Sequence, residues 1–265
     1  MKVVIFCGGM GIRMGEATRT VPKPMIPVGS RPIVWHIMGW YASWGHTDFI
    51  LCLGYLGDRI RDYFGVGGGA FCLNGDGPSF AGGADPSSWR VTFVDTGLHS
   101  LIGDRLKAVE SLVAGDEMFL ATYGDGLTDA PLDGMISTLE ESGKTGLFMS
   151  VCPRIDYHLV KSDDDGVVRS VTHFRTADVR INGGFFVFRH GIFDVLRPGE
   201  ELVDEPFARL IAKNELLGYR YDGFWEPMDT LKDKQKLEAL AASGAPPWSS
   251  RPGAHVQELR RAATG

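Results

Sequence analysis

A short apolar strand that runs directly into a glycine-rich turn opens the chain. The predicted strand covers residues 2–6 and is followed by the sequence GGMGIRM at 8–14. Glycine lets a backbone approach a ligand closely, so the N–H groups of such a turn can surround a phosphate. Arg13 adds a planar cation that suits phosphate oxygens. The pattern favours an α/β protein with an anion site after its first strand.

Short apolar runs alternate with helical stretches through the first half of the chain. The alternation predicts a doubly wound, mostly parallel, Rossmann-like sheet with helices on both faces. The strands are expected at 2–6, 48–53, 90–95 and 118–122, and the helices at 32–44, 57–64, 103–112 and 131–142.

The second half is richer in strands, and its turn at 163–166 predicts a hairpin in a small added β region. We expect one domain over 1–245, with a first part to about 130 and a second part after it, and a tail at 246–265. Residues 65–88, rich in Gly, Pro, Asp and Ser, are expected to be an excursion within that domain. The strands are predicted at 146–152, 159–161, 167–173 and 182–188, and the helices at 205–215, 231–242 and, in the tail, 256–262.

Composition and charge exclude several kinds of partner. The formal net charge is −6 with no basic stripe, which argues against nucleic acid. The longest apolar runs fall far below the roughly 20 residues of a membrane span, and the apolar run at the N-terminus is too short for a signal peptide. The four cysteines are widely spaced without a C-x-x-C pair, which favours reduced thiols in the cytoplasm over disulfides or zinc.

A second cluster, VPKPMIPV at 21–28, helps to distinguish two interpretations of the glycine-rich turn. A dinucleotide-binding turn would have the spacing G-x-G-x-x-G and an acidic residue about 20 positions further on. This chain has G-G-x-G, and Pro22-Lys23-Pro24 stands where the second strand would be expected to end. A dinucleotide-dependent oxidoreductase is therefore only a distant alternative.

The two clusters together resemble the signature of the sugar nucleotidyltransferase family, written G-G-x-G-T-R-L and then P-K-P-M. Ordered blocks as far as about residue 242 are similar to the branch of glucose-1-phosphate cytidylyltransferases, which make CDP-glucose. These blocks are WHIM at 35–38, GY at 54–55, DYF at 62–64, VDTG at 94–97, TYGDG at 122–126, INGGFFV at 181–187 and GFWEPMDT at 223–230. The resemblance implies an enzyme that joins a nucleoside triphosphate to a sugar 1-phosphate with Mg²⁺ and releases pyrophosphate. CTP is the nucleotide that this branch of the family implies.

Two aspartates are the expected metal ligands. Asp125 follows the strand predicted at 118–122, at the edge where open α/β sheets bind ligands. Asp229 precedes a predicted helix, and taken alone it is more typical of an N-cap. The resemblance implies that both aspartates hold the metal. It also implies that Lys23 contacts phosphate at the reaction centre and that Arg13 binds the part of the triphosphate that leaves as pyrophosphate.

The resemblance implies further site residues on both substrates. Arg105 is equally explained as an exposed residue at a helix start, and Trp225 as a packing residue. The nucleotide set is Gly8, Gly9, Gly11, Ile12, Arg13, Arg105 and Gly124, and the sugar-phosphate set is Lys23, Tyr123, Asn182, Gly183 and Trp225. His173 and Arg175 complete the second set as the cations that could replace a lysine that the family has shortly before Ile181.

The chain departs from the family pattern at three places. Ile12 stands where the family has threonine, and VTHFRT at 171–176 contains no counterpart of the lysine in the family's E-K-P block. YHLV at 157–160 replaces its F-G-A-L turn. We therefore expect the nucleotide half to be closer to the family than the sugar half. The alternatives are a catalytically weakened homologue that only binds a nucleotide or sugar nucleotide, and an enzyme that uses UTP or dTTP. The sugar phosphate can be glucose 1-phosphate or that of a related sugar, and the protein can be a homo-oligomer or a monomer.

Overall fold

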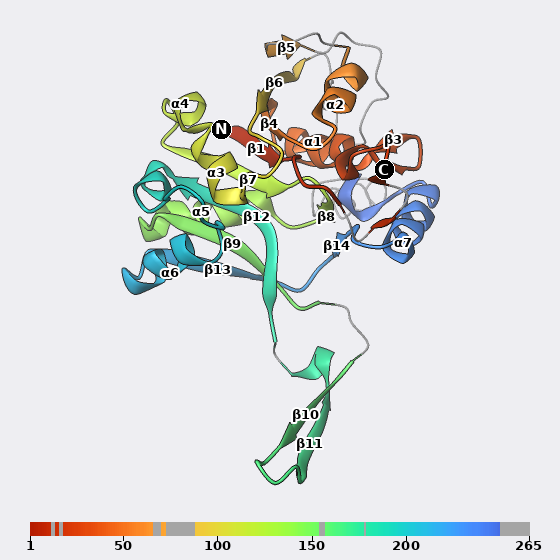
Figure 1. Ribbon diagram of the computed structural model, residues 1–265, viewed down its shortest axis with the longest axis vertical. Helices are drawn as coiled ribbons and strands as arrows, with labels where there is room; N and C mark the ends of the chain where they lie inside the picture. Colours follow the sequence, from red (N-terminus) through yellow and green to blue (C-terminus); the bar gives the residue numbers. More distant parts are fainter. Residues whose placement is uncertain are drawn as a thin grey trace, which may run out of the picture.

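An eight-stranded mixed sheet runs through the protein in the order β13-β9-β12-β7-β1-β4-β6-β5 (Figure 1). The computed structural model describes residues 1–11, 14–15, 18–65, 70–72, 88–153, 157–177 and 179–249. The strands of this sheet are β1 (Lys2–Phe6), β4 (Asp48–Leu53), β5 (Ala70–Cys72), β6 (Arg90–Asp95), β7 (Met118–Tyr123), β9 (Gly146–Val151), β12 (Ile181–Arg189) and β13 (Leu216–Tyr221). Three two-stranded sheets are formed by β2 (Pro27–Val28) with β3 (Arg31–Pro32), β8 (Gly126–Thr128) with β14 (Trp225–Pro227), and β10 (His158–Ser162) with β11 (Val168–His173).

The centre of the large sheet is parallel. β1 lies between β4 and β7 and is parallel to both, and β6 extends the parallel set beyond β4. β12 runs antiparallel to β7 and β9, while β13 is again parallel to β9. The expected mostly parallel α/β sheet is confirmed, with antiparallel pairing at β12 and at the edge strand β5.

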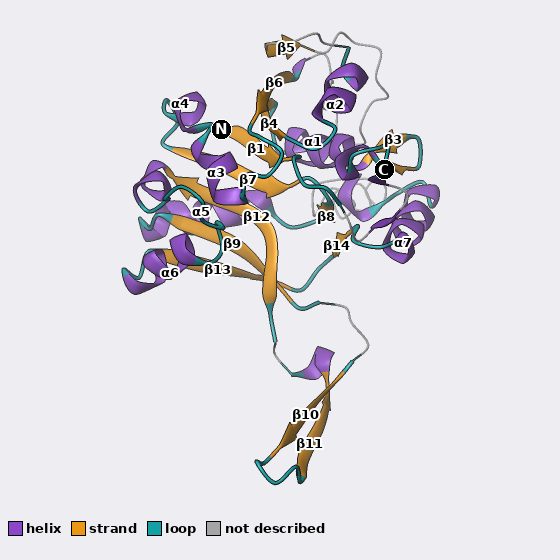
Figure 2. Ribbon diagram, in the orientation of Figure 1, coloured by secondary structure: helices purple, strands orange, loops and turns teal. Residues whose placement is uncertain are grey.

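Two apolar layers cover the two faces of this sheet. Side chains alternate along a strand, so Val3 and Ile5 enter one layer while Val4 and Phe6 enter the other. The first layer includes residues of α1 (Ile33–Ser43), α2 (Gly57–Tyr63), α5 (Leu132–Ser142) and α7 (Leu231–Ala242). The second includes residues of α3 (Ile102–Lys107), α4 (Glu110–Val113) and α6 (Glu205–Ala212). Helices on both faces were expected and are found (Figure 2).

Some predicted boundaries are wrong for identifiable reasons. The helix expected at 103–112 is two short helices, because Val109 leaves helical geometry at φ −107° and ψ 6° while its side chain is fully buried. The helix expected at 205–215 ends at Ala212, and Asn214 then takes a left-handed conformation that turns the chain into β13. Short 3₁₀ helices lie at Lys23–Met25, Phe174–Thr176, His190–Asp194 and Pro247–Ser249.

The predicted hairpin is confirmed as β10 and β11, which project from the body as a separate ribbon (Figure 1). Val160 and Val171 stand opposite each other, and they are 59% and 60% exposed. Most of the predicted excursion at 65–88 and the predicted tail helix at 256–262 lie outside the described residues. Within the described part of the chain, no helix is long and apolar enough to cross a membrane.

The contrast between the central sheet and the hairpin gives a stability prediction. Ile5→Ala should lower the free energy of unfolding by about 2–5 kcal/mol, because Ile5 is fully buried in β1 and its removal leaves a cavity. Val160→Ala should change it by less than about 0.5 kcal/mol. Urea denaturation followed by circular dichroism measures both. An equal cost at the two sites would mean that the hairpin is packed against another surface in solution.

Candidate active site

Two cavities open at the carboxyl ends of the central strands. The first, of 330 Å³, is lined by the segment after β1 and by the segment after β7, with Gly9, Gly11 and Gly124 among its residues. The second, of 310 Å³, lies between β7, β12 and β14. Tyr123 and Asp125 line both cavities. Two ligands bound in these cavities would therefore meet beside Asp125, at the edge where open α/β sheets bind substrates.

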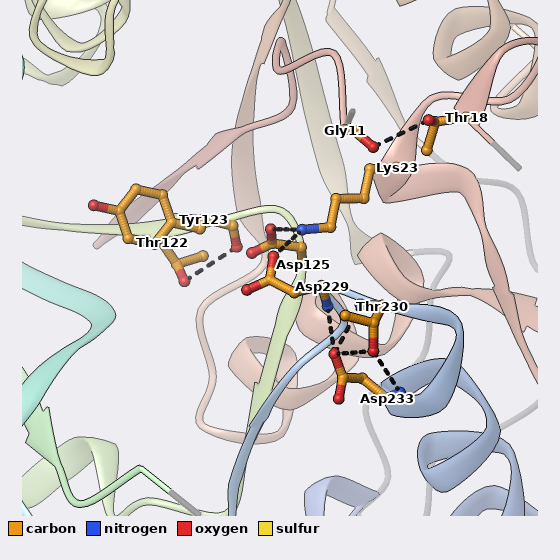
Figure 3. A network of polar contacts seen from close by, with 9 residues as sticks. All are labelled: Gly11, Thr18, Lys23, Thr122, Tyr123, Asp125, Asp229, Thr230 and Asp233. Carbon is orange, nitrogen blue, oxygen red and sulfur yellow. Dashed lines mark hydrogen bonds and ion pairs between the residues drawn. The ribbon is translucent and has the colours of Figure 1, made fainter. Parts of the chain in front are cut away.

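One ammonium group and two carboxylates form an ion triad where the cavities meet. Lys23 Nζ lies 2.6 Å from Asp125 Oδ2 and 2.7 Å from Asp229 Oδ1 (Figure 3). Burial alone would lower the pKa of the Lys23 ammonium, since Lys23 is 8% exposed, but the charge of Asp125 and hydrogen bonds to both carboxylates outweigh burial and raise it. The Lys23 side chain is therefore held in its charged ammonium form between the two aspartates.

A small ladder of backbone contacts brings the two aspartates together. Asp125 directly precedes β8, and Asp229 follows β14 by two residues. These strands are antiparallel with Gly126 opposite Pro227, and the N–H of Met228 donates to the carbonyl of Asp125 at 2.8 Å. Both carboxylates consequently lie at the same end of the β8–β14 pair.

The start of α7 fixes the backbone of Asp229. Thr230 is the N-cap of this helix and forms a capping box with Asp233. Asp233 Oδ2 also accepts from the N–H of Asp229 at 3.1 Å and from that of Thr230 at 2.8 Å (Figure 3). The sequence had favoured Asp229, taken alone, as an N-cap, but that role belongs to its neighbour. Asp233 was missed, although the T-x-x-D spacing at 230–233 is close to that of a capping box.

Lys23 owes its position to the prolines around it. Pro22 and Pro24 flank it, and the 3₁₀ turn Lys23–Met25 is closed by the N–H of Ile26, which donates to the Lys23 carbonyl. Proline fixes the backbone φ on both sides. The short turn thus directs one long side chain into the protein toward Asp125 and Asp229, as Figure 3 shows.

The donor set at the triad fits Mg²⁺. The described residues contain no group of three or more His, Cys, Asp or Glu side chains placed to hold a metal. Mg²⁺ needs fewer, because it commonly binds through one or two carboxylates and completes its shell with water and substrate phosphates. Asp125 and Asp229 supply two hard oxygen ligands that already converge on a cation, the Lys23 ammonium.

The second cavity contains most of the residues expected on the sugar side. Tyr123, Asn182, Gly183 and Trp225 all line it. Asn182 Nδ2 donates to the Tyr123 hydroxyl at 3.5 Å, and Trp225 Nε1 donates to the Gly183 carbonyl at 2.8 Å. The indole of Trp225 therefore fixes the wall of the cavity through a polar contact as well as by packing.

An irregular stretch of β12 shapes that wall. Asn182 pairs with Ser150 and Phe186 with Phe148, so β12 uses four positions where β9 uses two. Gly184 and Phe185 take positive φ values of 73° and 49°. Such a conformation is strained for phenylalanine, and the nearly fully buried Phe185 ring packs against Trp40 and Tyr41. A bulge in a strand changes the direction of the side chains around it, and bulges are common next to active sites.

Other expected site residues lie elsewhere. Arg105 lines neither cavity: it is 3% exposed and donates to backbone carbonyls. His173 is part of the projecting hairpin, where its ring contacts that of His158, and it also lines neither cavity. Ile12 and Arg13 fall outside the described residues, as does the side chain of Arg175. Gly8 stands between Cys7 and Gly9, which both line the first cavity, but it is not itself part of the lining.

Comparison with known proteins identifies relatives along nearly the whole chain. Residues 2–226 match the family model described as nucleotidyl transferase. The chain is 37% identical over 260 residues to a glucose-1-phosphate cytidylyltransferase of Salmonella typhi, a match that covers 94% of this chain and 99% of the relative. It is 35% identical to a probable glucose-1-phosphate cytidylyltransferase of Bacillus subtilis, with the same two coverages.

Solved structures share the fold at low sequence identity. A putative glucose-1-phosphate thymidylyltransferase from Bacillus anthracis, in complex with a sucrose, superposes with a TM-score of 0.66 at 17% identity, covering 91% of this chain and 95% of that one. A UDP-glucose pyrophosphorylase complexed with UDP-glucose gives 0.68 at 15% identity, with 92% and 99% covered.

The triad predicts an unusual effect of removing a positive charge. Lys23→Met should tighten Mn²⁺ binding to the nucleotide-free protein by at least ~10-fold, equivalent to ~1.4 kcal/mol, because the ammonium no longer competes for the two carboxylates. Titration calorimetry with Mn²⁺ measures this. Lys2→Met is the matched control: it removes the ion pair between Lys2 and Asp116 at 3.1 Å and should leave Mn²⁺ binding unchanged. An affinity equal to wild type in Lys23→Met would contradict a metal site at these carboxylates.

Proposed function

We propose that this chain, which belongs to the nucleotidyl transferase family, transfers a cytidylyl group from CTP to a sugar 1-phosphate and releases pyrophosphate. The observation that carries the proposal is the convergence of Asp125 and Asp229 on Lys23 where two cavities meet. Cytidylyltransferase relatives that match nearly end to end support CTP as the nucleotide and glucose 1-phosphate or a related sugar as the acceptor.

The reaction needs no covalent enzyme intermediate. A phosphate oxygen of the sugar 1-phosphate attacks the α-phosphorus of CTP, a new O–P bond forms, and the bond to the β-phosphate oxygen breaks as pyrophosphate leaves. Placing the acceptor in the second cavity and the triphosphate in the first brings the two reacting groups together at Asp125. Positioning and charge stabilisation then supply most of the catalysis.

The residues of the site divide this work. The backbone of Gly9 and Gly11 approaches the phosphates, Arg13 binds the pyrophosphate side, and the Lys23 ammonium balances phosphate charge. Asp125 and Asp229 would hold Mg²⁺, which when bound neutralises charge on the phosphate oxygens. Asn182 supplies an amide that can hydrogen-bond sugar hydroxyls.

The chain is proposed to divide into a nucleotide part to about residue 130 and a sugar part over 131–245. The first cavity is lined only by residues of the first part, whereas the second also draws on β12 and β14. One continuous sheet joins the two parts. We also propose that the enzyme works in the cytoplasm, and the free thiols of Cys7, Cys52 and Cys152 support a reducing environment.

Pyrophosphate release tests the function directly. Purified protein with Mg²⁺, CTP and glucose 1-phosphate should release pyrophosphate, with UTP, dTTP and other sugar 1-phosphates as comparison substrates. Asp125→Asn and Asp229→Asn should each lower kcat by roughly 100-fold or more, because metal-based charge stabilisation provides several kcal/mol. Asp164→Asn, in the exposed turn of the hairpin, is the control. No pyrophosphate release with any substrate, together with CTP binding measured by calorimetry, would favour a catalytically weakened homologue that only binds the nucleotide.

The acceptor cavity gives a separate prediction. Asn182→Ala should raise KM for the sugar phosphate by about 10-fold through the loss of a hydrogen bond, while KM for CTP stays within about twofold. Steady-state kinetics with each substrate varied in turn measures both constants. An equal rise in the two KM values would argue that the substitution disturbs β12 as a whole.

A further inference from the structure

The residues that end β8 hold the turn that leads into β14. Trp225, the first residue of β14, pairs with Thr128. One position further out, the N–H of Asp129 donates to the carbonyl of Phe224 at 3.3 Å, and the N–H of Phe224 donates to Asp129 Oδ1 at 2.8 Å. Thr128 Oγ1 donates to the same Phe224 carbonyl at 2.8 Å. A side-chain carboxylate thus replaces the backbone carbonyl of an antiparallel ladder, and it fixes the backbone just before Trp225.

The same carboxylate contacts the end of β13. The hydroxyl of Tyr221, the last residue of that strand, donates to Asp129 Oδ1. Burial and the hydrogen bond to the Asp129 carboxylate raise the pKa of this hydroxyl, so Tyr221 stays protonated and remains the donor. A Cβ atom on Gly223 would stand 2.1 Å from the Tyr221 hydroxyl oxygen, so the turn lies close over it. One carboxylate oxygen therefore joins both ends of the turn 221–224.

Trp225, which follows this turn, lies between two cavities. It lines the second cavity and also a third one, of 210 Å³, at the ends of β9 and β13. A side chain has no packing contacts on the side where it borders empty space. Packing alone therefore leaves the indole room to move toward the third cavity. The bond from Trp225 Nε1 to the Gly183 carbonyl, at 2.8 Å, holds it in the wall of the second cavity while its backbone stays in place.

Asp129 can act on a bound sugar only through the backbone. It lines none of these three cavities. The triad at the other end of β14 has its own supports, which are the bond from the Met228 N–H to the Asp125 carbonyl and the capping box at Thr230. A looser turn should consequently move the wall of the second cavity while the two metal-binding carboxylates keep their places.

We propose that Asp129 is a positioning residue that sets the size of the second cavity: together with Tyr221 it fixes the turn before β14 and so holds Trp225 against Gly183. The inference rests on the proposed function, in which the second cavity takes the sugar 1-phosphate. It makes the contact between Asp129 and Tyr221 a determinant of which sugar phosphates the enzyme accepts.

Steady-state kinetics on three variants tests this role. Asp129→Ala removes the acceptor of two hydrogen bonds, Tyr221→Phe removes one donor, and Asp129→Asn keeps an acceptor oxygen. In Asp129→Ala, KM for glucose 1-phosphate should rise about 10-fold, while kcat and KM for CTP stay within about twofold of wild type. The rise in Tyr221→Phe should be about 3-fold, through the loss of one hydrogen bond. Asp129→Asn should keep KM for glucose 1-phosphate close to the wild-type value.

The choice of acceptor gives a second readout. If the indole can move, the second cavity can take a larger sugar. The ratio of kcat/KM for an N-acetylhexosamine 1-phosphate to that for glucose 1-phosphate should then rise at least ~10-fold in Asp129→Ala.

Two variants serve as matched controls. Asp133→Asn changes an exposed aspartate in the first turn of α5, and Tyr63→Phe removes a hydroxyl that accepts an exposed hydrogen bond from Arg31. Neither should change KM or the ratio. A fall in kcat with an unchanged KM for glucose 1-phosphate in Asp129→Ala would overturn the proposal in favour of support of the triad. A lower melting temperature with unchanged KM and ratio would overturn it in favour of general support of the fold.

Exchange of the Trp225 indole proton keeps the inference separate from the proposed function. In the ligand-free protein, this proton gives the indole N–H signal that is absent from the NMR spectrum of Trp225→Phe. It should exchange with D₂O at least ~10-fold faster in Asp129→Ala and ~3-fold faster in Tyr221→Phe, because its bond to Gly183 opens more often. Unchanged exchange in a folded Tyr221→Phe protein would overturn the proposal even if Asp129→Ala failed to fold. If wild type used no sugar phosphate, the function would fail while this exchange result still decided the positioning role.

Discussion

The site depends on two aspartate carboxylates that both contact one lysine ammonium. Asp125 and Asp229 come from opposite halves of the chain, and their carboxylates would repel at this separation without a counter-charge. Lys23 supplies that charge, and the β8–β14 ladder with the Asp125–Met228 contact fixes the backbone beneath it. The two cavities meet where these three segments come together, since Asp125 lines both.

Sequence reasoning succeeded where burial was continuous. β1 and β4 have the predicted bounds because parallel strands covered on both faces are nearly unbroken apolar runs. β8 and β14 have three residues each, and β13 alternates half-buried and exposed positions, so no such run marks them. The pairing that brings Asp125 to Asp229 was therefore invisible in the sequence, although the two residues themselves were predicted from family resemblance.

The sugar side was less predictable because local patterns do not give the direction of a segment. His173 was expected near the acceptor from its distance along the chain to Ile181, but the strand that carries it belongs to a ribbon projecting from the body. For Arg105, only the alternative of an exposed residue at a helix start is wrong, because the side chain is 3% exposed. Arginine is mostly exposed in proteins, and only the packing of three strand ends shows why this one is buried.

Different elements hold the triad and form the wall of the second cavity. The triad is held by the Lys23 turn, the β8–β14 pair and the cap of α7, whereas the acceptor wall is formed largely by the bulged stretch of β12 and by Trp225. Replacing hydrogen-bonding groups on β12 would alter contacts with a sugar without moving the carboxylates. A change on β12 or at Trp225 can therefore alter the proposed acceptor contacts while the geometry of the triad is kept, because none of the elements that hold the triad lies on β12.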